Sequence, residues 1–495
     1  MYAVKFLDMK EECVKPFRLG LIVTIIIGLT FLWTGSAFLS WVYNVADLLE
    51  SIGRINMLEG LTEGVGYVFQ ALGIMITCVI IRQLLSSHAP DPSDDRKMKL
   101  IFAAVSIADL LFSYLSACAA SLFGALIFGY VQNTFHGIIA ALYIYMLTLY
   151  VDVNRRGLVF GLGYSIGSLG SYFISIIGDS NFLADIRSIF LYIFIVLLTL
   201  FLIYMCSYDS QSVPYAVFKS ETTDESHVSS TSNIVLLAAV VVILLSLVKG
   251  LGFYFDFSDV WVGGMSLEYT RMFYATGLIV AGLINDINRR WGGIICVAAL
   301  VFPFVLILLN SASVSGTVLW ILNYSFTGLY VVYRVLLFSD IAWESLRTKP
   351  ISQKSSLIYL APLGLMFGRI GDVISTGIGL CFADSPIVLN ILTAIMFVIA
   401  IIVFLALFSR HYLGVYAVMT KDESHSPVSF CDHYKLTDRE SIVLMHITDK
   451  MTNKEIASEL FVQESTVKYH VKNILKKTGC SNRQELKKLY SEYNS

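Results

Sequence analysis

The chain has 495 residues, of which 56% are hydrophobic and only 15% charged, and its mean hydropathy is +0.71. An ordinary soluble domain carries about 25% charged residues, so this composition excludes a soluble protein and indicates a chain that crosses a membrane several times. The net charge of −2 averages a basic C-terminal region with the rest, and therefore does not identify partners.

Twelve apolar segments follow one another through residues 1–410, and each is long enough to cross a hydrocarbon core of about 30 Å as a helix. We predict an all-α membrane domain with spans at 19–43, 64–84, 98–118, 123–150, 156–178, 187–206, 233–254, 267–285, 293–310, 317–340, 356–380 and 387–410. The eight cysteines are scattered, mostly within apolar segments, which predicts reduced and buried side chains.

The basic residues of the connecting loops predict the orientation of the spans. With the N-terminus in the cytoplasm, the cytoplasmic loops contain Arg82, Arg96, Lys97, Lys99, Arg155, Arg156, Lys219, Arg289, Arg290, Arg347, Lys349 and Lys354. The opposite loops contain only Arg54, Arg187 and Arg271. This asymmetry follows the positive-inside rule. With an even number of spans, it predicts a multi-pass protein of the inner (cytoplasmic) membrane whose two termini are both cytoplasmic.

A polar segment at 207–232 divides the spans into halves at 1–206 and 233–410. After the eighth span, the sequence GLINDINRRWG places an aspartate and two arginines between glycines: Gly282, Asp286, Arg289, Arg290 and Gly292. This loop, in a chain of two six-span halves, resembles the signature loop of the major facilitator superfamily (MFS). The resemblance implies a 6+6 bundle in which the aspartate and the cations cap helix ends and hold the cytoplasmic side shut. An unrelated twelve-helix bundle is the alternative.

Several polar side chains fall inside the predicted spans, where a charge normally faces a cavity or a partner because its burial in lipid is costly. They are Asp109, Gln132, His136, Arg334, Arg369 and Asp372. Arg369 and Asp372 share a helix face and either neutralise each other or line a central cavity for a small polar or anionic molecule. In the second case Asp109 is the expected counter-charge. Lys249 falls near the end of a span, where extension to the membrane interface would account for it.

The end of the chain differs in composition, and 411–434 predicts a linker before a separate domain at 435–495. In this domain one helix has an apolar face with Val467, Val471 and Ile474, and beside it a face with Lys468, Lys472 and Lys476. A shorter helix at 453–460, capped by Thr452 or Asn453, precedes it across a tight connection at 461–463. A supporting helix begins at a capping box of Thr437 and Glu440, and a fourth covers 482–490. This order is typical of a helix-turn-helix.

The sequence LTDRESIVLMHITDKMTNKEIASELFVQESTVKYHVKNILKKTGCSNR resembles the LuxR-type (GerE-like) helix-turn-helix of bacterial transcription regulators. Thr478 and Cys480 depart from it, since they replace apolar residues. The resemblance implies DNA binding by Lys454, Thr466, Val467, Lys468, Tyr469, His470, Lys472, Asn473 and Lys476. Of these, Lys468, Tyr469 and Lys472 would face base edges, and Lys454, Thr466, Asn473 and Lys476 the phosphates. It also implies dimers on DNA, with Leu486 and Leu489 as a pairing face. The alternative is that the lysines form only a solvated helix face.

Together these features favour a membrane-bound one-component transcription regulator. A small molecule would shift a two-state equilibrium of the bundle and change the pairing of the C-terminal domains on DNA. The alternative is an active MFS-type transporter with a regulatory DNA-binding tail. The sequence contains no Gly-rich phosphate loop, nucleophile elbow or metal-ligand cluster, so we predict no enzyme, cofactor or metal. Expected partners are double-stranded promoter DNA, membrane lipid, an unidentified small molecule and a second copy of the chain.

Overall fold

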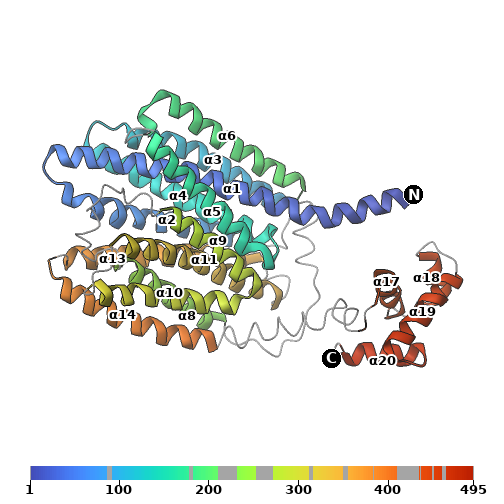
Figure 1. The fold of residues 1–495 in the computed structure, drawn as a ribbon. Coiled ribbons are helices and arrows are strands. Elements are labelled where there is room, and N and C mark those ends of the chain that lie inside the picture. The colour runs from blue at the N-terminus through green and yellow to red at the C-terminus, as the bar shows by residue number, and fades with distance from the viewer. Residues whose placement is uncertain are drawn as a thin grey trace. The chain divides into compact units, whose positions relative to one another are not determined.

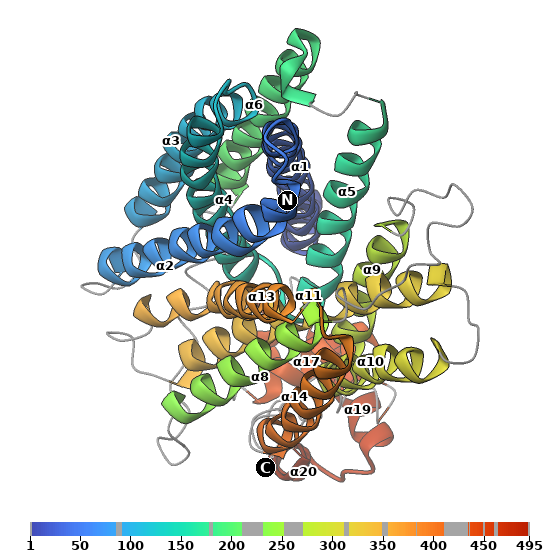
Figure 2. The same ribbon diagram turned by 90° about the vertical axis from the view of Figure 1, so that its left-hand side faces the viewer.

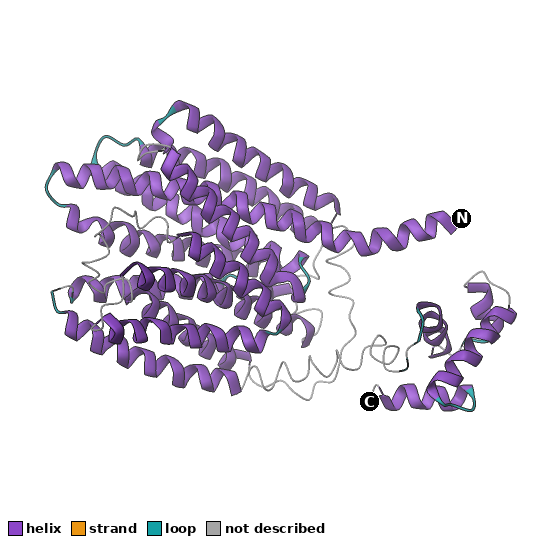
Figure 3. Ribbon diagram, in the orientation of Figure 1, coloured by secondary structure: helices purple, strands orange, loops and turns teal. Residues whose placement is uncertain are grey.

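The computed structural model describes residues 2–85, 92–177, 182–209, 231–251, 271–310, 316–348, 355–382, 384–409, 434, 436–448, 451–459 and 464–493. The regular elements within these ranges are all helical, and Figure 3 shows no strand among them. The chain divides into two compact units, a membrane unit at Met1–Leu407 and a C-terminal unit at Phe408–Ser495. Residues 210–230 and 410–433, which hold most of the predicted central loop and linker, lie outside the described ranges.

Each of the twelve predicted spans overlaps a helix of the membrane unit (Figure 1). The first half contains α1 (Tyr2–Ser51), α2 (Gly66–Leu85), α3 (Pro92–Ala117), α4 (Leu122–Tyr150), α5 (Arg156–Ile177) and α6 (Ile186–Asp209). The second half contains α8 (Thr231–Leu251), α9 (Arg271–Ile287), α10 (Arg289–Asn310), α11 (Gly316–Thr348), α13 (Leu363–Cys381) and α14 (Pro386–Leu407). Short helical turns lie between them: η1 (Ile55–Met57), η2 (Gly60–Val65), η3 (Val153–Arg155), η4 (Phe182–Ala184) and η9 (Ser355–Leu360). The all-α fold class is therefore confirmed.

The composition of the helices suits hydrocarbon, where a helix satisfies every backbone amide within its own segment. In the described residues, ten helices are long and apolar enough to cross a membrane, and α9 contributes a shorter apolar helix, Met272–Ile287. On α6 the exposed side chains form an apolar stripe at helical spacing: Phe190, Phe194, Leu197 and Phe201. An apolar stripe of this kind needs lipid beside it. The chain is a multi-pass membrane protein.

The most extensive contacts between the two halves are those of α2 with α13 and of α5 with α9, and α11 also contacts α4 and α5, while each half forms its own group of helices (Figure 2). The α5–α9 pair approaches to backbone contact. An ideal Cβ atom at Gly282 would lie 2.5 Å from the carbonyl oxygen of Gly157, so only glycine fits there. Glycine at this crossing thus brings the ends of α5 and α9 within hydrogen-bond reach of each other.

The C-terminal unit is built from α17 (Asp438–Thr448), α18 (Asn453–Glu459), α19 (Glu464–Thr478) and α20 (Arg483–Tyr493). Its core contains the predicted apolar face of α19 together with residues of the other three helices: Val443, Leu444, Ile447, Ile456, Ala457, Val467, Val471, Ile474 and Leu486. Because these side chains bury one another within the unit, the unit has a hydrophobic core of its own.

Reciprocal hydrogen bonds begin two of these helices. The Thr437 backbone N–H donates to Glu440 Oε2 at 2.8 Å, and the Glu440 N–H donates to Thr437 Oγ1 at 3.4 Å, so the predicted capping box is confirmed. At α18 the Thr452 N–H donates to Glu455 Oε2 at 2.7 Å, and the Glu455 N–H donates to Thr452 Oγ1 at 3.3 Å. The cap of α18 is therefore Thr452 rather than Asn453.

Candidate functional site

The α19 helix presents a polar surface on the side that faces away from the core. Its exposed side chains are Thr466, Lys468, Tyr469, Lys472 and Lys476, and His470 and Asn473 are half-buried beside them. Lys468 Nζ lies 2.8 Å from Glu464 Oε1 in an exposed pair one turn apart. A helix that is apolar on one side and offers cations and hydrogen-bond donors on the other has the chemistry of a helix that reads a DNA major groove.

A partly buried ion pair fixes α19 against α17. Lys477 Nζ donates to Glu440 Oε2 at 2.5 Å, and the Glu440 side chain is only 5% exposed. Burial raises the pKa of the Glu440 carboxyl, but the hydrogen bonds from Lys477 and from the Thr437 amide outweigh burial and hold the pKa below its ordinary value. Lys477 therefore positions the helix, while the other lysines of α19 remain exposed.

The C-terminal end of α19 and the start of α20 are also held by polar contacts. Thr478 Oγ1 donates to the Ile474 carbonyl at 2.8 Å, which satisfies the hydroxyl that replaces an apolar side chain of the family pattern. Gly479 follows with a φ of 73°, the left-handed conformation that ends a helix. Arg483 donates to Asn453 Oδ1 at 3.0 Å and to the Met451 carbonyl, and so ties α20 to the start of α18.

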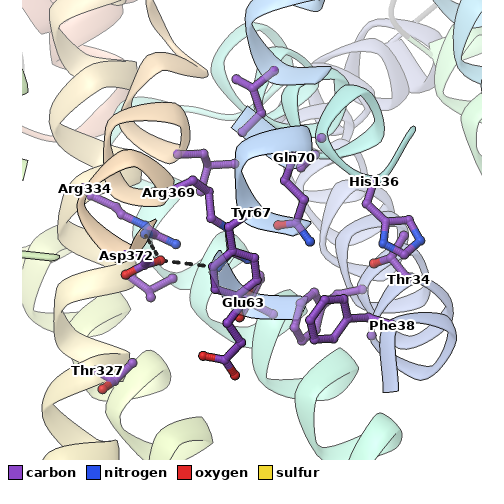
Figure 4. Close-up of a pocket in the computed structure, with 18 of the residues that line it drawn as sticks. Thr34, Phe38, Glu63, Tyr67, Gln70, His136, Thr327, Arg334, Arg369 and Asp372 are labelled. Carbon is purple, nitrogen blue, oxygen red and sulfur yellow. Dashed lines mark hydrogen bonds and ion pairs between the residues drawn. The ribbon is translucent and has the colours of Figure 1, made fainter. Parts of the chain in front are cut away.

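A cavity of about 530 Å³ lies within the membrane unit and is lined by helices of both halves (Figure 4). Its volume falls in the range of small-molecule sites, about 300–1,000 Å³. Four of the six predicted cavity residues line it, namely His136, Arg334, Arg369 and Asp372. Aromatic side chains form much of the remaining wall, among them Phe31, Phe38, Tyr67, Tyr143, Tyr164 and Tyr274.

Three cations in the cavity wall surround the single carboxylate of Asp372. Its Oδ1 lies 2.7 Å from Lys249 Nζ, and its Oδ2 lies 3.3 Å from Arg369 Nη1 and 4.0 Å from Arg334 Nη1. Arg369 also lies over the ring of Tyr67, 4.0 Å from the ring centre. The Arg369–Asp372 pair is therefore made, but one carboxylate cannot neutralise three cations. The interpretation of Lys249 as an interfacial residue was wrong, because its ammonium turns inward to Asp372.

Glu59 and Glu63 line the cavity from the first half, although neither was predicted from the sequence. Glu63 lies in η2, a single π-helical segment before α2, and π-helical turns are common at functional sites. The two carboxylates were missed because they precede the predicted span 64–84 and so were assigned to a loop. Their spacing of four residues, directly before an apolar span, was the signal that could have placed both carboxylates on one face of a helix.

Two of the predicted cavity residues contact other side chains of the first half instead. Asp109 is fully buried, accepts a hydrogen bond from Trp33 Nε1 at 2.7 Å and lies 3.3 Å from His136 Nε2. Gln132 accepts from Ser116 Oγ at 2.5 Å. Neither residue lines the cavity, so the prediction that they do was wrong. The counter-charge assigned to Asp109 is supplied by Asp372, because α3 turns its aspartate toward α1 and α4.

Polar contacts also join the two halves at one end of the bundle. Both carboxylate oxygens of Asp286 accept backbone N–H groups at the start of α5, from Gly157 at 2.8 Å and Leu158 at 2.6 Å. Arg289 donates to Asp340 Oδ2 at 2.8 Å, to Asp286 Oδ1 at 3.0 Å and to the carbonyl of Val153. The aspartate of the signature loop thus caps a helix of the other half, as the MFS resemblance implies.

Residues 434–489 match the family model described as bacterial regulatory proteins, luxR family. The spore germination protein GerE of Bacillus subtilis is 44% identical over 50 residues, which cover 10% of this chain and 68% of GerE. The chain belongs to the LuxR family. The nitrate/nitrite response regulator protein homolog of Haemophilus influenzae is 44% identical over 59 residues, 12% of this chain and 28% of that protein. The transcriptional regulatory protein LiaR of Bacillus subtilis is 44% identical over 61 residues, 29% of its length. The likeness to the two longer regulators is thus confined to less than a third of each.

The membrane part of this LuxR-family chain is similar to the crystal structure of the human organic anion transporter MFSD10 (TETRAN). The TM-score is 0.53 at 14% identity, and the alignment covers 79% of this chain and 99% of that one. At this identity the similarity concerns the fold alone. The protein therefore combines a LuxR-type domain with an MFS-like membrane domain.

The LuxR-type domain places most of the DNA-binding residues predicted from the sequence on the polar surface of α19. Val467 differs, because its side chain is fully buried in the domain core and so positions the helix instead of reaching outward. Leu486, predicted for a pairing face, is likewise buried and is not available to a second copy. Lys454 is the second residue of α18, and its side chain lies outside the described part of the structure.

Proposed function

We propose that this protein is a membrane-bound one-component transcription regulator. A small molecule binds in the cavity of the MFS-like domain, and the LuxR-type domain binds promoter DNA. The proposal depends on one observation: the same chain contains a LuxR-type domain with a polar α19 surface and a membrane domain with a charged cavity. In this proposal the MFS-like domain lies in the bacterial inner membrane with both termini in the cytoplasm, where the DNA is, and the positive-inside asymmetry of the loops supports that orientation.

The coupling follows from the location of the cavity between the halves. A ligand that contacts both halves stabilises the arrangement of the bundle in which both sets of contacts are made, and so shifts the equilibrium toward it. The polar contacts of Asp286, Arg289 and Asp340 belong to the arrangement described here. A ligand that favours another arrangement must break them. Pairing of the LuxR-type domains as a homodimer on DNA then depends on the arrangement of the membrane domains.

The second candidate is an active transporter with a regulatory DNA-binding tail. It is favoured by the same cavity and by the same contacts between the halves, since alternating access uses both. The two candidates differ in turnover, because a sensor needs only to be occupied, whereas a transporter must release its ligand on the opposite side of the membrane.

The proposal is tested by mapping the DNA bound by the tagged full-length protein in its own cells, and by footprinting the enriched promoters with residues 434–495. We expect a small set of promoters and protection of one sequence over random duplex. Binding that is equal for all sequences contradicts the regulator. Ligand uptake into vesicles that contain the purified protein, absent from empty vesicles, favours the transporter instead.

A further inference from the structure

The charged side chains of the cavity are segregated between the two halves of the bundle. The first half contributes the carboxylates Glu59 and Glu63. The second half contributes Lys249, Arg334 and Arg369 around Asp372. Figure 4 shows the Glu63 carboxylate set apart from the group around Asp372. A molecule in the cavity therefore meets an acidic group on one side and a cationic group on the other.

The cationic side has hydrogen-bond donors that the described residues leave unsatisfied. Arg334 is 3% exposed, yet its Nε and Nη1 atoms have no hydrogen-bond partner among the described residues, and Nη1 lies 4.0 Å from Asp372. Asp372 is already engaged at 2.7 Å by Lys249 and at 2.5 Å by Ser246. Buried donors without partners are costly, and a guanidinium prefers an oxyanion that accepts two of its N–H groups. This side fits a carboxylate or a similar oxyanion of the ligand.

The acidic side has one carboxylate that is open to the cavity. The Glu63 side chain is exposed to that space, and no hydrogen bond or ion pair from the described residues reaches it. A carboxylate enclosed by a membrane domain is stabilised by a cationic partner, and a ligand ammonium supplies both the charge and the donors. Aromatic side chains, among them Phe31, Phe38 and Tyr164, line the same cavity.

From this geometry we infer that the ligand is a small amphoteric molecule with an aromatic or apolar body. Its oxyanion pairs with Arg334 and Arg369, and its protonated amine pairs with Glu63. This inference rests on the proposed function and extends it. The oxyanion of such a ligand contacts the second half of the bundle, and its amine contacts the first half. A molecule with only one of the two charges leaves the other half without its ionic partner, and so binds more weakly.

The inference is tested with matched sets of three compounds that share one body: tyrosine, tyramine and 3-(4-hydroxyphenyl)propionate, with the corresponding phenyl and indole sets. Binding to the purified full chain is measured by titration calorimetry. In at least one set we expect the zwitterion to bind about tenfold or more tightly than either singly charged compound, since each charge adds a charge-assisted hydrogen bond. Equal affinity for the zwitterion and the acid, or no binding in every set, overturns the inference.

The Glu63→Gln variant tests whether Glu63 is the residue that binds the ligand amine. We expect its affinity for the zwitterion to fall to that of the acid, while its affinity for the acid, which also reports correct folding, stays unchanged. Glu50→Gln, an exposed change at the end of α1 away from the cavity, is the matched control and should bind as the wild type. An unchanged zwitterion affinity in Glu63→Gln contradicts the amine site. If that result is found and Arg369→Gln nevertheless abolishes binding of the acid, the amine site is wrong, but a ligand site in the cavity, and with it the proposed sensor, remains.

Discussion

Glu440 shows how one side chain can serve two structural purposes in the LuxR-type domain. Its carboxylate accepts the Thr437 N–H at the start of α17 and the ammonium of Lys477 from α19. The first contact begins a helix, and the second sets the distance between the supporting helix and the helix with the exposed lysines. The orientation of α19 on DNA therefore depends on a residue that does not face DNA.

Glu440→Gln should destabilise the isolated C-terminal unit by about 1–3 kcal/mol at pH 7, because glutamine keeps the capping acceptor but loses the charge that pairs with Lys477. The folded-state pKa of Glu440 lies below its ordinary value of 4.5. Its contribution is therefore present above about pH 4.5 and is lost as the pH falls through the folded-state pKa. Urea unfolding at pH 7 and at lower pH measures both effects. Glu464→Gln, which breaks the exposed pair with Lys468, is the control and should change stability little.

Two exposed lysines of α19 should differ in what they contribute to DNA binding. If Lys472 contacts a base, Lys472→Ala weakens binding to the cognate promoter by about 1–3 kcal/mol and relaxes the sequence preference. Lys476→Ala should weaken binding to all sequences alike and reduce the salt dependence by about one counterion. Titration of cognate and random duplexes at several salt concentrations separates the two roles. An unchanged preference in Lys472→Ala rules out a base contact.

At the scale of elements, the α5–α9 crossing joins the halves through backbone as well as side chains. The glycines allow the close approach, and Asp286 then reaches the N–H groups of Gly157 and Leu158 in the first turn of α5. The carboxylate also lies at the positive end of the α5 dipole, which adds to the attraction. The helix pair thus resists separation most at the end of the bundle where Asp286 lies.

Asp286→Asn should lower the thermal midpoint of the full chain, since a helix cap of this kind contributes about 0.5–2 kcal/mol. If separation of the halves is part of signalling, the same variant should also change promoter activity in the absence of added ligand. Asp152→Asn is the control, because Asp152 caps only the neighbouring turn through the Asn154 N–H and does not contact the second half. A wild-type midpoint and wild-type promoter activity for Asp286→Asn contradict a coupling role for this contact.

At the scale of the whole molecule, sensing and DNA binding belong to units with separate cores. Arg369→Ala should therefore abolish the ligand-dependent change in promoter activity while leaving binding of the full-length protein to its promoter DNA unchanged. The comparison is made in the small-molecule screen in which the wild type responds, with a promoter reporter as readout. A normal response by the variant places the ligand site elsewhere. Lost DNA binding by the full-length variant would contradict the independence of the two units.

Local residue patterns are enough to specify the helices and the fold class. The twelve apolar segments specify helices because their length and composition suit the bilayer, and α17 to α20 follow from local periodicity and capping residues such as Thr437. These signals are local, so no knowledge of the packing was needed. The capping role of Asp286 was likewise implied by the pattern around it.

Which polar side chains share the cavity depends on how the helices pack. Asp109 and Asp372 are both carboxylates within apolar segments, yet one packs against Trp33 and the other gathers three cations, of which only Arg369 is near it in the sequence. Glu63 and Lys249 lie near the ends of their segments and still face the cavity. The face that a helix turns inward depends on the neighbouring helices of both halves. Those neighbours are distant in the sequence, and the spacing of residues within one helix does not identify them.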